Sequence, residues 1–285
     1  MSSLEKNVLP ATAILGVGAM GGAILEGLLS PGVEFSVPVN VTTFTDASSE
    51  KYSSRAGVIA HSLESDPEAN LKAVAGAKVV IIGVKPHMII DLIKEIASHL
   101  APNTVLISVA AGVEIETIQK LLPSGVTVVR AMPNTPSLVR RGVTGITASS
   151  EAPRKSLDLA RELFETVGKV IILESESQLN SLTAASGGGP AYVFLFIEKM
   201  TDAVKKLGFS ASEAKIIVEE TFLGASLLLE KMGADPKQLR QDVTSPNGTT
   251  EQALKRFESA RLDVTISEAL KAAIDRAEEL AKLGS

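Results

Sequence analysis

The 285-residue sequence contains no cysteine and no tryptophan, and it has only 3 histidines. Without cysteine there can be no disulfide, thiolate zinc site, cysteine-ligated iron–sulfur cluster or cysteine nucleophile, and three histidines supply few ligands for any other metal site. We therefore expect no metal cofactor. A chain without cysteine also suits a reducing compartment, so we expect a cytoplasmic location.

An excess of basic charge and long apolar runs are also missing. The chain has 28 Lys and Arg residues against 33 Asp and Glu residues, for a net charge of -5, and this balance argues against nucleic-acid binding. No run of about 18 apolar residues occurs, and residues 1–10 do not combine a basic segment with an apolar one. We therefore expect no membrane span, no membrane partner and no secretion signal.

The residues that are present indicate a globular chain of two domains. Hydrophobic residues make up 45% of the sequence and charged residues 21%, which is ordinary for globular proteins. Short β-branched runs alternate with helical patterns up to residue 174, as in a parallel sheet with helices on both faces, and helical patterns alone follow. We predict a doubly wound α/β domain over residues 1–174 and an all-helical domain over residues 175–285.

The element boundaries follow from apolar periodicity and from Gly, Pro, Ser and Asn at the breaks. Strands are predicted at residues 11–17, 39–45, 57–60, 79–83, 104–108, 126–131, 145–148 and 170–173. Helices of the second domain are predicted at residues 175–185, 190–207, 211–231, 236–241, 250–258 and 264–282. Residues 216–229 are apolar on more than one face, which predicts burial against a second copy in a homodimer or a larger homo-oligomer built from dimers.

A G-x-G-x-x-G sequence follows the first predicted strand and leads into a helical pattern over residues 23–29. In this context the first glycine permits a tight turn, the second lets the backbone approach a pyrophosphate, and the third allows close packing of helix on strand. The stretch consists of Gly16, Val17, Gly18, Ala19, Met20 and Gly21. It predicts a dinucleotide site in a Rossmann-type domain; the alternative is a glycine turn that serves packing alone.

The end of the second strand selects between the two nicotinamide dinucleotides. Hydroxyl and basic side chains suit the 2′-phosphate of NADP, and this stretch offers Thr43, Thr45, Ser48, Ser49, Lys51 and Arg55. Asp46 would favour NAD if it lay at the tip of the strand, and it could instead serve only as a helix N-cap. We favour NADP, with NAD as the alternative.

Two loops at predicted strand ends offer further groups for chemistry, because ligands of such sheets lie at the carboxyl edge. Val84, Lys85 and Pro86 follow one strand, and Asn134 follows another in a loop that two prolines stiffen. Each has a plain structural alternative. Lys85 could be an ion-pair partner at the edge of the core, and the loop at Asn134 could merely leave the sheet.

Residues 242–254 are rich in hydroxyl groups and lead into a predicted helix. The N-terminus of a helix, with Ser and Thr donors beside it, suits a carboxylate because free amides and the helix dipole both favour an anion. The same pattern also describes an ordinary N-cap. From the residues alone, both interpretations stay open.

Taken in order, these motifs resemble those of the pyrroline-5-carboxylate reductases, and the resemblance extends over nearly the whole chain. It rests on residues 16–21, 83–86, 132–136, 186–192 and 243–254. Two positions depart from the common family pattern: Asn247 stands where a second glycine is usual, and Gly188 stands where serine is frequent. Asn tolerates left-handed backbone angles, so the turn at Asn247 should survive.

The resemblance implies an oxidoreductase that converts 1-pyrroline-5-carboxylate to proline, in the last step of proline biosynthesis, by hydride transfer to the cyclic imine. It implies that residues 16–21 and 43–48 hold the cofactor, with residues 84–86 and Asn134 near the nicotinamide. It also implies that the helical domain binds the substrate through Ser245, Gly248, Thr249 and Thr250. We assign the catalytic role to the Thr250 hydroxyl, which would orient the ring nitrogen.

Other functions would use the same first domain. A β-hydroxyacid dehydrogenase has a similar order of domains, but residues 186–197 lack the Lys and Asn, four apart, that this family carries there. A non-catalytic nucleotide-binding sensor would not need a carboxylate site at Ser245. Methyl transfer from S-adenosylmethionine would leave the helical domain unexplained.

Overall fold

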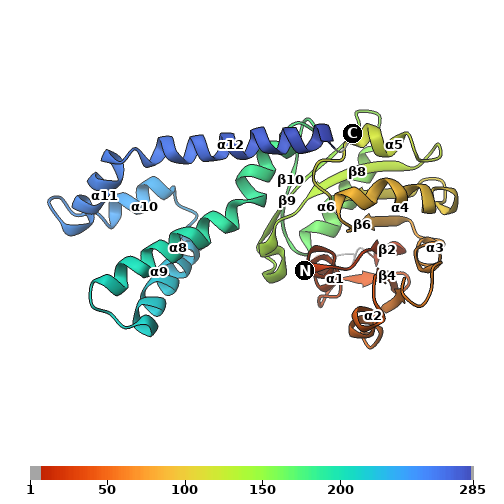
Figure 1. Cartoon of the computed structure of the whole chain (residues 1–285), viewed down its shortest axis with the longest axis horizontal. Helices are drawn as coiled ribbons and strands as arrows, with labels where there is room; N and C mark the ends of the chain where they lie inside the picture. The colour runs from red at the N-terminus through yellow and green to blue at the C-terminus, as the bar shows by residue number, and fades with distance from the viewer. Residues whose placement is uncertain (1–7, 284–285) are drawn as a thin grey trace, which may run out of the picture. The chain divides into compact units, whose positions relative to one another are not determined.

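The computed structural model describes residues 8–283, and its contacts separate two compact units. The sheet unit reaches to Gly187 and also includes the chain from Ala273 onward, and the helical unit comprises Gly188–Ala272. Figure 1 shows the strands and helices by label. Within the described residues, no helix combines the length and the apolar character needed to cross a membrane.

The strands fall close to their predicted positions. Those of the main sheet are β2 (Thr12–Leu15), β4 (Val39–Thr43), β5 (Val58–Ser62), β6 (Val79–Ile82), β7 (Val105–Ser108), β8 (Thr127–Met132), β9 (Gly142–Ala148) and β10 (Gly168–Ile172). Two short strands, β1 (Val8–Leu9) and β3 (Glu34–Phe35), pair in a sheet of their own that the sequence did not predict.

The helices of the sheet unit connect these strands. They are α1 (Ala19–Leu28), α2 (Asp46–Ser53), α3 (Ala69–Val74), α4 (Ile89–Ile96), α5 (Ile115–Gln119), α6 (Arg154–Glu165) and α7 (Gln178–Leu182). Short 3-10 turns lie at η1 (Pro86–Met88), η2 (Ala97–His99) and η3 (Thr135–Val139), and the π-helical turn η4 (Thr183–Gly187) follows α7. The predicted boundary at residue 174 lies just after β10, whereas the unit division falls at Gly187, since α7 still buries Leu179 in the sheet unit.

The main sheet has the order β10-β9-β8-β7-β6-β2-β4-β5. Each neighbouring pair is parallel except β8 and β9, which are antiparallel. The sheet is therefore mostly parallel, as predicted, with one reversal. The reversal follows from chain length, because the short η3 turn between β8 and β9 cannot make the crossover of about a dozen residues or more that a parallel pair needs.

Helices cover both faces of the sheet, which confirms the doubly wound architecture. Side chains alternate along β2: Ile14 joins the cluster under α1 and α6, whereas Ala13 and Leu15 join the cluster under α3, α4 and α5. Strands buried on both faces in this way appear in the sequence as nearly continuous apolar runs.

The strand order reverses at β2, and this fixes where a ligand can bind. From β2 the chain passes to β4 and β5 on one side and then returns to β6 on the other. The loops after β2 and β6 diverge at such a point, so a crevice opens at the carboxyl ends of these two strands. The G-x-G-x-x-G turn and the Val84–Pro86 segment follow these two strands.

The helical unit follows the predicted helices closely. Its helices are α8 (Gly189–Lys206), α9 (Ala211–Met232), α10 (Pro236–Asp242), α11 (Thr249–Ser259) and the first half of α12 (Leu262–Leu283). A capping box begins α9, in which the Ser210 hydroxyl accepts from the Glu213 amide and the Glu213 carboxylate accepts from the Ser210 amide. Gly233, with φ of 59°, ends α9.

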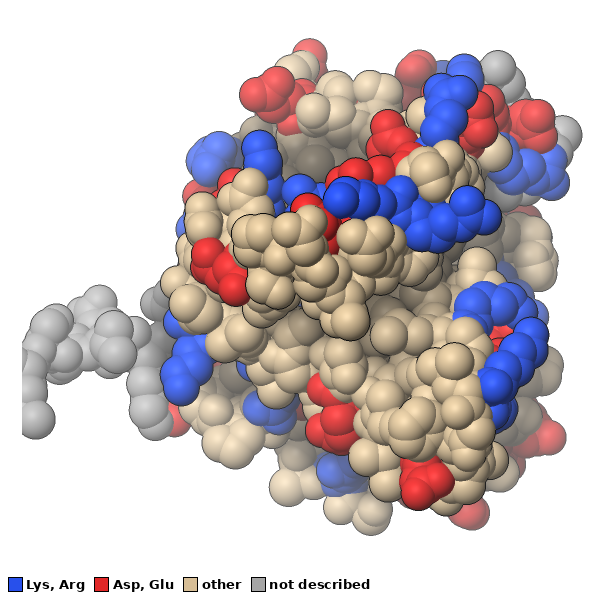
Figure 2. Space-filling model, turned by 90° about the vertical axis from the view of Figure 1, so that its left-hand side faces the viewer, with Lys and Arg blue, Asp and Glu red and all other residues tan. Residues whose placement is uncertain are grey.

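Large apolar side chains of the helical unit are exposed in the single chain. Among the buried hydrophobic residues of the described chain, this unit contributes Ala214 and Val218. Figure 2 views the protein from the side where Figure 1 labels α9, α10 and α11, and uncharged side chains cover much of this face. Exposed apolar residues of this unit include Phe194, Phe196, Ile216, Leu223, Leu227 and Leu228. An exposed apolar area of this extent is typical of an interaction surface.

Candidate functional site

The predicted nucleotide turn lies between β2 and α1. Gly16 has a φ of 84°, in the left-handed region that glycine adopts without strain. Its amide donates to the Thr42 hydroxyl over 3.1 Å, and the Val17 amide donates to the Thr42 carbonyl over 2.9 Å. A Cβ atom at Gly16 would lie 2.7 Å from Val84 Cγ1. The turn is thus tied to β4 and packed against the loop after β6.

Glycine allows three backbone segments to meet at this turn. A Cβ atom at Gly21 would lie 2.8 Å from the Gly16 carbonyl oxygen, and one at Gly83 would lie 2.7 Å from the same oxygen. At Gly18, in contrast, a Cβ atom would meet nothing within 4 Å. Gly21 and Gly83 therefore serve close packing, whereas Gly18 leaves open space beside the backbone, as the approach of a pyrophosphate requires.

Helix α1 begins at Ala19 rather than at the predicted residue 23, so Met20 and Gly21 lie in its first turn. The pair Gly21-Gly22 has low helix propensity, and for this reason the sequence predicted a start of the helix after it. Position 21 nevertheless requires glycine, because a side chain there would clash with the Gly16 carbonyl. The N-cap is Gly18, which offers no side-chain hydrogen bond to the helix. The first amides of α1 are therefore left for another acceptor, and the helix dipole favours an anion.

Thr43, Thr45 and Ser48 form a hydrogen-bonded turn where β4 leads into α2. The Thr43 hydroxyl donates to the Thr45 carbonyl over 3.0 Å, and the Thr45 hydroxyl donates to Ser48 Oγ over 2.9 Å. Thr45 is the N-cap of α2, since its hydroxyl also accepts from the Ser48 amide over 3.3 Å. The interpretation of Asp46 as the N-cap is wrong by one residue: Asp46 is the first residue of the helix.

Asp46 also does not lie at the tip of β4, which ends at Thr43. Its amide donates to Glu64 Oε2 over 2.9 Å. Hydrogen bonds from the Ser62 and Ser65 side chains hold the pKa of Asp46 below its ordinary value. These contacts engage the Asp46 carboxylate with the end of β5.

Two cavities border the segment after β6. The first, the β4-side cavity, has a volume of about 460 Å³ and is lined in part by Gly16, Thr43, Phe44, Val84 and His87. The second, the β8-side cavity, also measures about 460 Å³ and is lined in part by Pro86, His87, Ala111, Arg130 and Thr183. Lys85 is exposed and is the N-cap of η1. The sheet unit thus brings three predicted residues, Gly16, Thr43 and Val84, together around one cavity.

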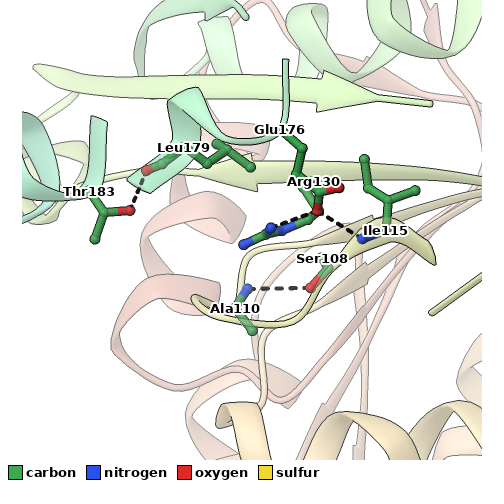
Figure 3. A network of polar contacts seen from close by, with 7 residues as sticks. All are labelled: Ser108, Ala110, Ile115, Arg130, Glu176, Leu179 and Thr183. Carbon is green, nitrogen blue, oxygen red and sulfur yellow. Dashed lines mark hydrogen bonds and ion pairs between the residues drawn. The ribbon is translucent and has the colours of Figure 1, made fainter. Parts of the chain in front are cut away.

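A buried ion pair that the sequence did not predict borders the β8-side cavity (Figure 3). Arg130 Nη1 lies 2.7 Å from Glu176 Oε1, and the same oxygen accepts from the Ile115 amide over 2.8 Å. The Arg130 side chain is 7% exposed and that of Glu176 is 30% exposed. Glu176 therefore joins β8 to the start of α5. An arginine within the otherwise apolar strand β8 is the sequence signal that could have found this pair.

Asn134 braces the loop after β8. Its side-chain amide donates to the Ser186 carbonyl over 3.1 Å and to Ser186 Oγ over 3.0 Å, and its carbonyl oxygen accepts from the Val143 amide over 2.9 Å. Asn134 is 8% exposed and does not line either cavity described above. In this structure Asn134 connects the π-helical turn η4 to β9, and a contact with a cofactor stays a prediction.

In the helical unit, Ser245 and Gly248 form a tight turn before α11. The Gly248 amide donates to the Ser245 carbonyl over 3.0 Å. A Cβ atom at Gly248 would overlap the Ser245 hydroxyl and lie 3.0 Å from the Ser245 carbonyl oxygen. Asn247 has a φ of 60°, so asparagine does occupy the left-handed position in this turn, as expected.

Helix α11 begins directly after this turn. Gly248 is its N-cap and supplies no side-chain hydrogen bond, and Thr249 and Thr250 are exposed in its first turn. Glu251 accepts from the Asn247 amide over 3.1 Å and lies 3.0 Å from Lys255 Nζ. The Lys255 ammonium is the main cause that lowers the pKa of Glu251. The start of α11 thus combines uncapped amides with hydroxyl groups, which are the donors that a carboxylate accepts.

Two family models match the chain. Residues 176–280 match the model described as pyrroline-5-carboxylate reductase dimerisation, and residues 11–112 match the model described as NADP oxidoreductase, coenzyme F420-dependent. The first match covers the whole helical unit, and the second covers the glycine turn and the Val84–Pro86 segment.

Relatives match over almost the full length. The chain is 37% identical over 273 residues to a pyrroline-5-carboxylate reductase of Pseudomonas aeruginosa, covering 96% of this chain and 97% of the relative. The structure of a pyrroline-5-carboxylate reductase from Coxiella burnetii superposes with a TM-score of 0.87 at 37% identity, covering 94% of this chain and 97% of that chain. The Plasmodium falciparum pyrroline carboxylate reductase, solved with NADP bound, shares the fold with a TM-score of 0.79 at 24% identity, over 97% of this chain and 99% of that one. The chain therefore belongs to the pyrroline-5-carboxylate reductase family.

Proposed function

We propose that this protein reduces 1-pyrroline-5-carboxylate to proline with NADPH as the hydride donor, and that NADH is the less preferred alternative. Membership of the family supports the reaction. The match of residues 11–112 to an NADP oxidoreductase model supports the cofactor. A β-hydroxyacid dehydrogenase activity is set aside, because the chain belongs to a different family over nearly its full length.

The cofactor assignment is supported by the glycine turn after β2. Gly16, Gly21 and Gly83 exclude side chains where backbone segments meet, while Gly18 leaves open space beside uncapped amides of α1. These residues fit a pyrophosphate. We propose that the adenosine half lies in the β4-side cavity, which Thr43 and Val84 line, and that the nicotinamide half extends past Pro86 toward the β8-side cavity.

The proposed substrate site rests on one observation: helix α11 begins without a side-chain cap at Gly248, next to the Ser245 hydroxyl. We propose that Ser245 and the amides of Thr249 and Thr250 bind the substrate carboxylate, and that Gly248, whose own amide donates to the Ser245 carbonyl, shapes the turn that holds them. Glycine at position 248 keeps the Ser245 hydroxyl close to these amides, since any side chain would displace it. The donors all belong to one rigid turn, so they can orient the carboxylate as well as bind it.

When bound, the reduced nicotinamide supplies the hydride that adds to the imine carbon. The task of the protein is to hold the two reacting atoms about 3–3.5 Å apart in the correct orientation. We propose that the exposed Thr250 hydroxyl hydrogen-bonds the ring nitrogen and orients it. A protonated imine already carries activating charge, so a hydroxyl suffices and no strongly perturbed acid is required at this position.

We propose further that the helical unit, within the predicted domain of residues 175–285, joins two copies into a dimer. The match of residues 176–280 to a dimerisation model supports this proposal, as does the exposed apolar surface of α8 and α9. Light scattering should give the mass of a dimer or of a multiple of it. A fully active monomer would contradict the proposal.

The reaction is tested by the loss of reduced-nicotinamide absorbance with purified protein and 1-pyrroline-5-carboxylate, in parallel with NADPH and NADH. We expect oxidation that depends on the imine and is faster with NADPH at equal low concentrations. Omission of the imine is the control. If folded protein binds the nucleotide but oxidises neither cofactor, the reductase proposal fails and the non-catalytic sensor takes its place.

A further inference from the structure

A cavity of about 280 Å³ lies at the amino ends of the strands, at the edge of the main sheet opposite the glycine turn. Lys78, Val105 and Thr127 line it from the starts of β6, β7 and β8, and Lys155 and Ser156 line it from the start of α6. The other residues that line it are Pro10, Asn103, Pro153 and Leu159. We call it the amino-edge cavity. It is separate from the carboxyl ends of β2 and β6, where the nucleotide is proposed to bind.

Helix α6 begins at this cavity with two basic residues, Arg154 and Lys155, and without an acidic residue in its first turn. The helix dipole opposes cations at this end and favours anions. The charge of Arg154 is matched, because its Nε lies 3.5 Å from Asp158 Oδ1. Lys155 is exposed and forms no ion pair within residues 8–283. An anion in the amino-edge cavity would therefore relieve an unfavourable charge at the start of α6.

The start of α6 also offers free backbone donors. Its N-cap is Pro153, which supplies no side-chain hydrogen bond to the helix. The Ser156 amide donates to the Pro153 carbonyl over 2.8 Å. The amides of Arg154 and Lys155 have no partner in the helix, as is general for the first residues of a helix. Two amides and the positive end of the dipole are thus left for an anion.

The hydroxyl of Ser156 points to a ligand independently of the helix terminus. Ser156 lines the cavity and is only 3% exposed, yet its hydroxyl forms no hydrogen bond within the described part of the chain. Buried hydroxyl groups normally have a partner. The side chains of Asn103 and Thr127 line the same cavity and also form no hydrogen bond within residues 8–283. Three polar side chains are therefore free to bind a molecule in the cavity.

The charge around the cavity is of one sign. Lys78 and Lys155 line it, and no Asp or Glu does so among the residues that the structure describes. Like Lys155, Lys78 is exposed and forms no ion pair within that range. The two ammonium groups come from different elements to one space, so an anion with two negative charges compensates both of them. Lysine side chains, free helix amides and hydroxyl groups together are typical donors to a phosphate group.

We propose that the amino-edge cavity binds a phosphate group through Lys78, Lys155, the Ser156 hydroxyl and the first amides of α6. The cavity is larger than one tetrahedral anion, and Val105 and Leu159 form an apolar part of its wall. The phosphate is therefore either free or carried by a small phosphate monoester. Once bound, it links α6 to the starts of β6, β7 and β8 and stabilises the folded sheet unit by mass action.

Calorimetric titration with inorganic phosphate tests the site. NADP is present throughout to occupy the glycine turn, and sodium chloride keeps the ionic strength constant. We expect saturable binding with a Kd of about 1 mM or tighter. Ser156→Ala should weaken it about tenfold or more, through loss of a hydrogen bond to a charged group, and Lys155→Gln about threefold or more. Lys169→Gln is the matched control, because Lys169 is exposed on β10 and does not line the cavity, and it should leave the affinity unchanged.

Thermal unfolding provides a second readout. Phosphate should raise the Tm of wild type and of Lys169→Gln above the value in sodium chloride of equal ionic strength, and it should raise the Tm of Ser156→Ala by less. Without phosphate, Ser156→Ala should unfold near the wild-type Tm, because its hydroxyl has no partner in the described chain to lose. If Ser156→Ala does not fold, Lys155→Gln still tests the site, since Lys155 is exposed.

Phenyl phosphate distinguishes the two sources of the group. Tighter binding of phenyl phosphate than of inorganic phosphate would identify a phosphate monoester as the ligand, and equal or weaker binding would identify free phosphate. The proposal is overturned if phosphate shows no saturable binding to wild type. It is also overturned if Ser156→Ala and Lys155→Gln bind phosphate as wild type does, or if Lys169→Gln shows the same loss as these variants.

Discussion

The buried pair of Arg130 and Glu176 allows a prediction of stability that depends on charge rather than on side-chain volume. Glu176→Ala removes the carboxylate that accepts from both the Arg130 guanidinium and the Ile115 amide. Arg130 is 7% exposed, so its charge would remain in the interior without a partner. The Ile115 amide would also lose its acceptor at the start of α5.

The expected cost follows from these two losses. Removing one partner of a fully buried ion pair costs about 3–5 kcal/mol. Because the Glu176 side chain is 30% exposed, water can reach the site, and we expect about 2 kcal/mol for the charge, with about 1 kcal/mol more for the Ile115 amide. A total of about 3 kcal/mol corresponds to a fall in Tm of about 6–12 °C for a unit of this size.

The comparison that isolates the charge is the double variant Arg130→Met with Glu176→Leu. It removes both charges and fills similar volume, so only the Ile115 amide loses a partner and the cost should be about 1 kcal/mol or less. Urea unfolding followed by circular dichroism measures these differences, since the chain has no tryptophan to report by fluorescence. All variants are compared at one protein concentration, because association shifts apparent stability.

One outcome would refute the reasoning. If the double variant is as unstable as Glu176→Ala, the cost cannot come from an unpaired charge. The pair would then act through shape or through the loop before α5. If the double variant regains stability but its kcat stays reduced, the pair of Arg130 and Glu176 would instead belong to the catalytic site.

Three further predictions concern the two predicted binding turns. Gly16→Ala should weaken nucleotide binding at least tenfold in calorimetry, because the residue has a φ of 84° and its Cβ would lie 2.7 Å from Val84 Cγ1; unchanged affinity would contradict the packing argument. Thr250→Ala should lower kcat by about tenfold or more with nucleotide affinity unchanged, as expected for loss of one hydrogen bond to the reacting nitrogen, and unchanged turnover in folded protein would remove Thr250 from the reaction. Because its folded pKa is lowered, Glu251 should contribute stability above its ordinary pKa and lose it as the pH falls through the folded pKa. In urea unfolding, Glu251→Gln should therefore be less stable than wild type near about pH 6, and this difference should shrink as the pH falls below the ordinary pKa of a glutamate. A difference that stays constant with pH would show that the charge is not responsible.

Much of the fold could be predicted from the sequence because its signals are local. Apolar runs located the strands of the main sheet, and Gly, Pro and Ser breaks located α8 to α11 within a residue or so. The reversal between β8 and β9 was missed, although the short connection that forces it is visible in the sequence. The predicted start of helix α1 was too late because Gly21 has a low helix propensity. Only the contact of Gly21 with the Gly16 carbonyl explains why glycine occupies this position.

Binding sites could be proposed from the sequence only where one contiguous segment carries the pattern. The glycine turn and the start of α11 are such segments, and the binding of an anion at each stays a prediction. Contacts between distant segments left no such signal: the bonds of Asn134 to Ser186, and of Glu176 to Ile115, join residues far apart in the chain. Asp46 was misjudged because its surroundings come from β5 and the residues after it, which the local pattern does not contain.

The central position of β2 also has a consequence for the order in which the protein can be made. Thr12 pairs with Val79, so the ribosome delivers β4 and β5 before the second neighbour of β2 exists. During this interval an apolar strand has one open edge, which is a hazard for aggregation of the nascent chain. Gly16 cannot pack against Val84 until β6 and the residues that follow it have emerged from the ribosome. Nucleotide can therefore stabilise the finished unit, but it comes too late to guide the first steps of its folding.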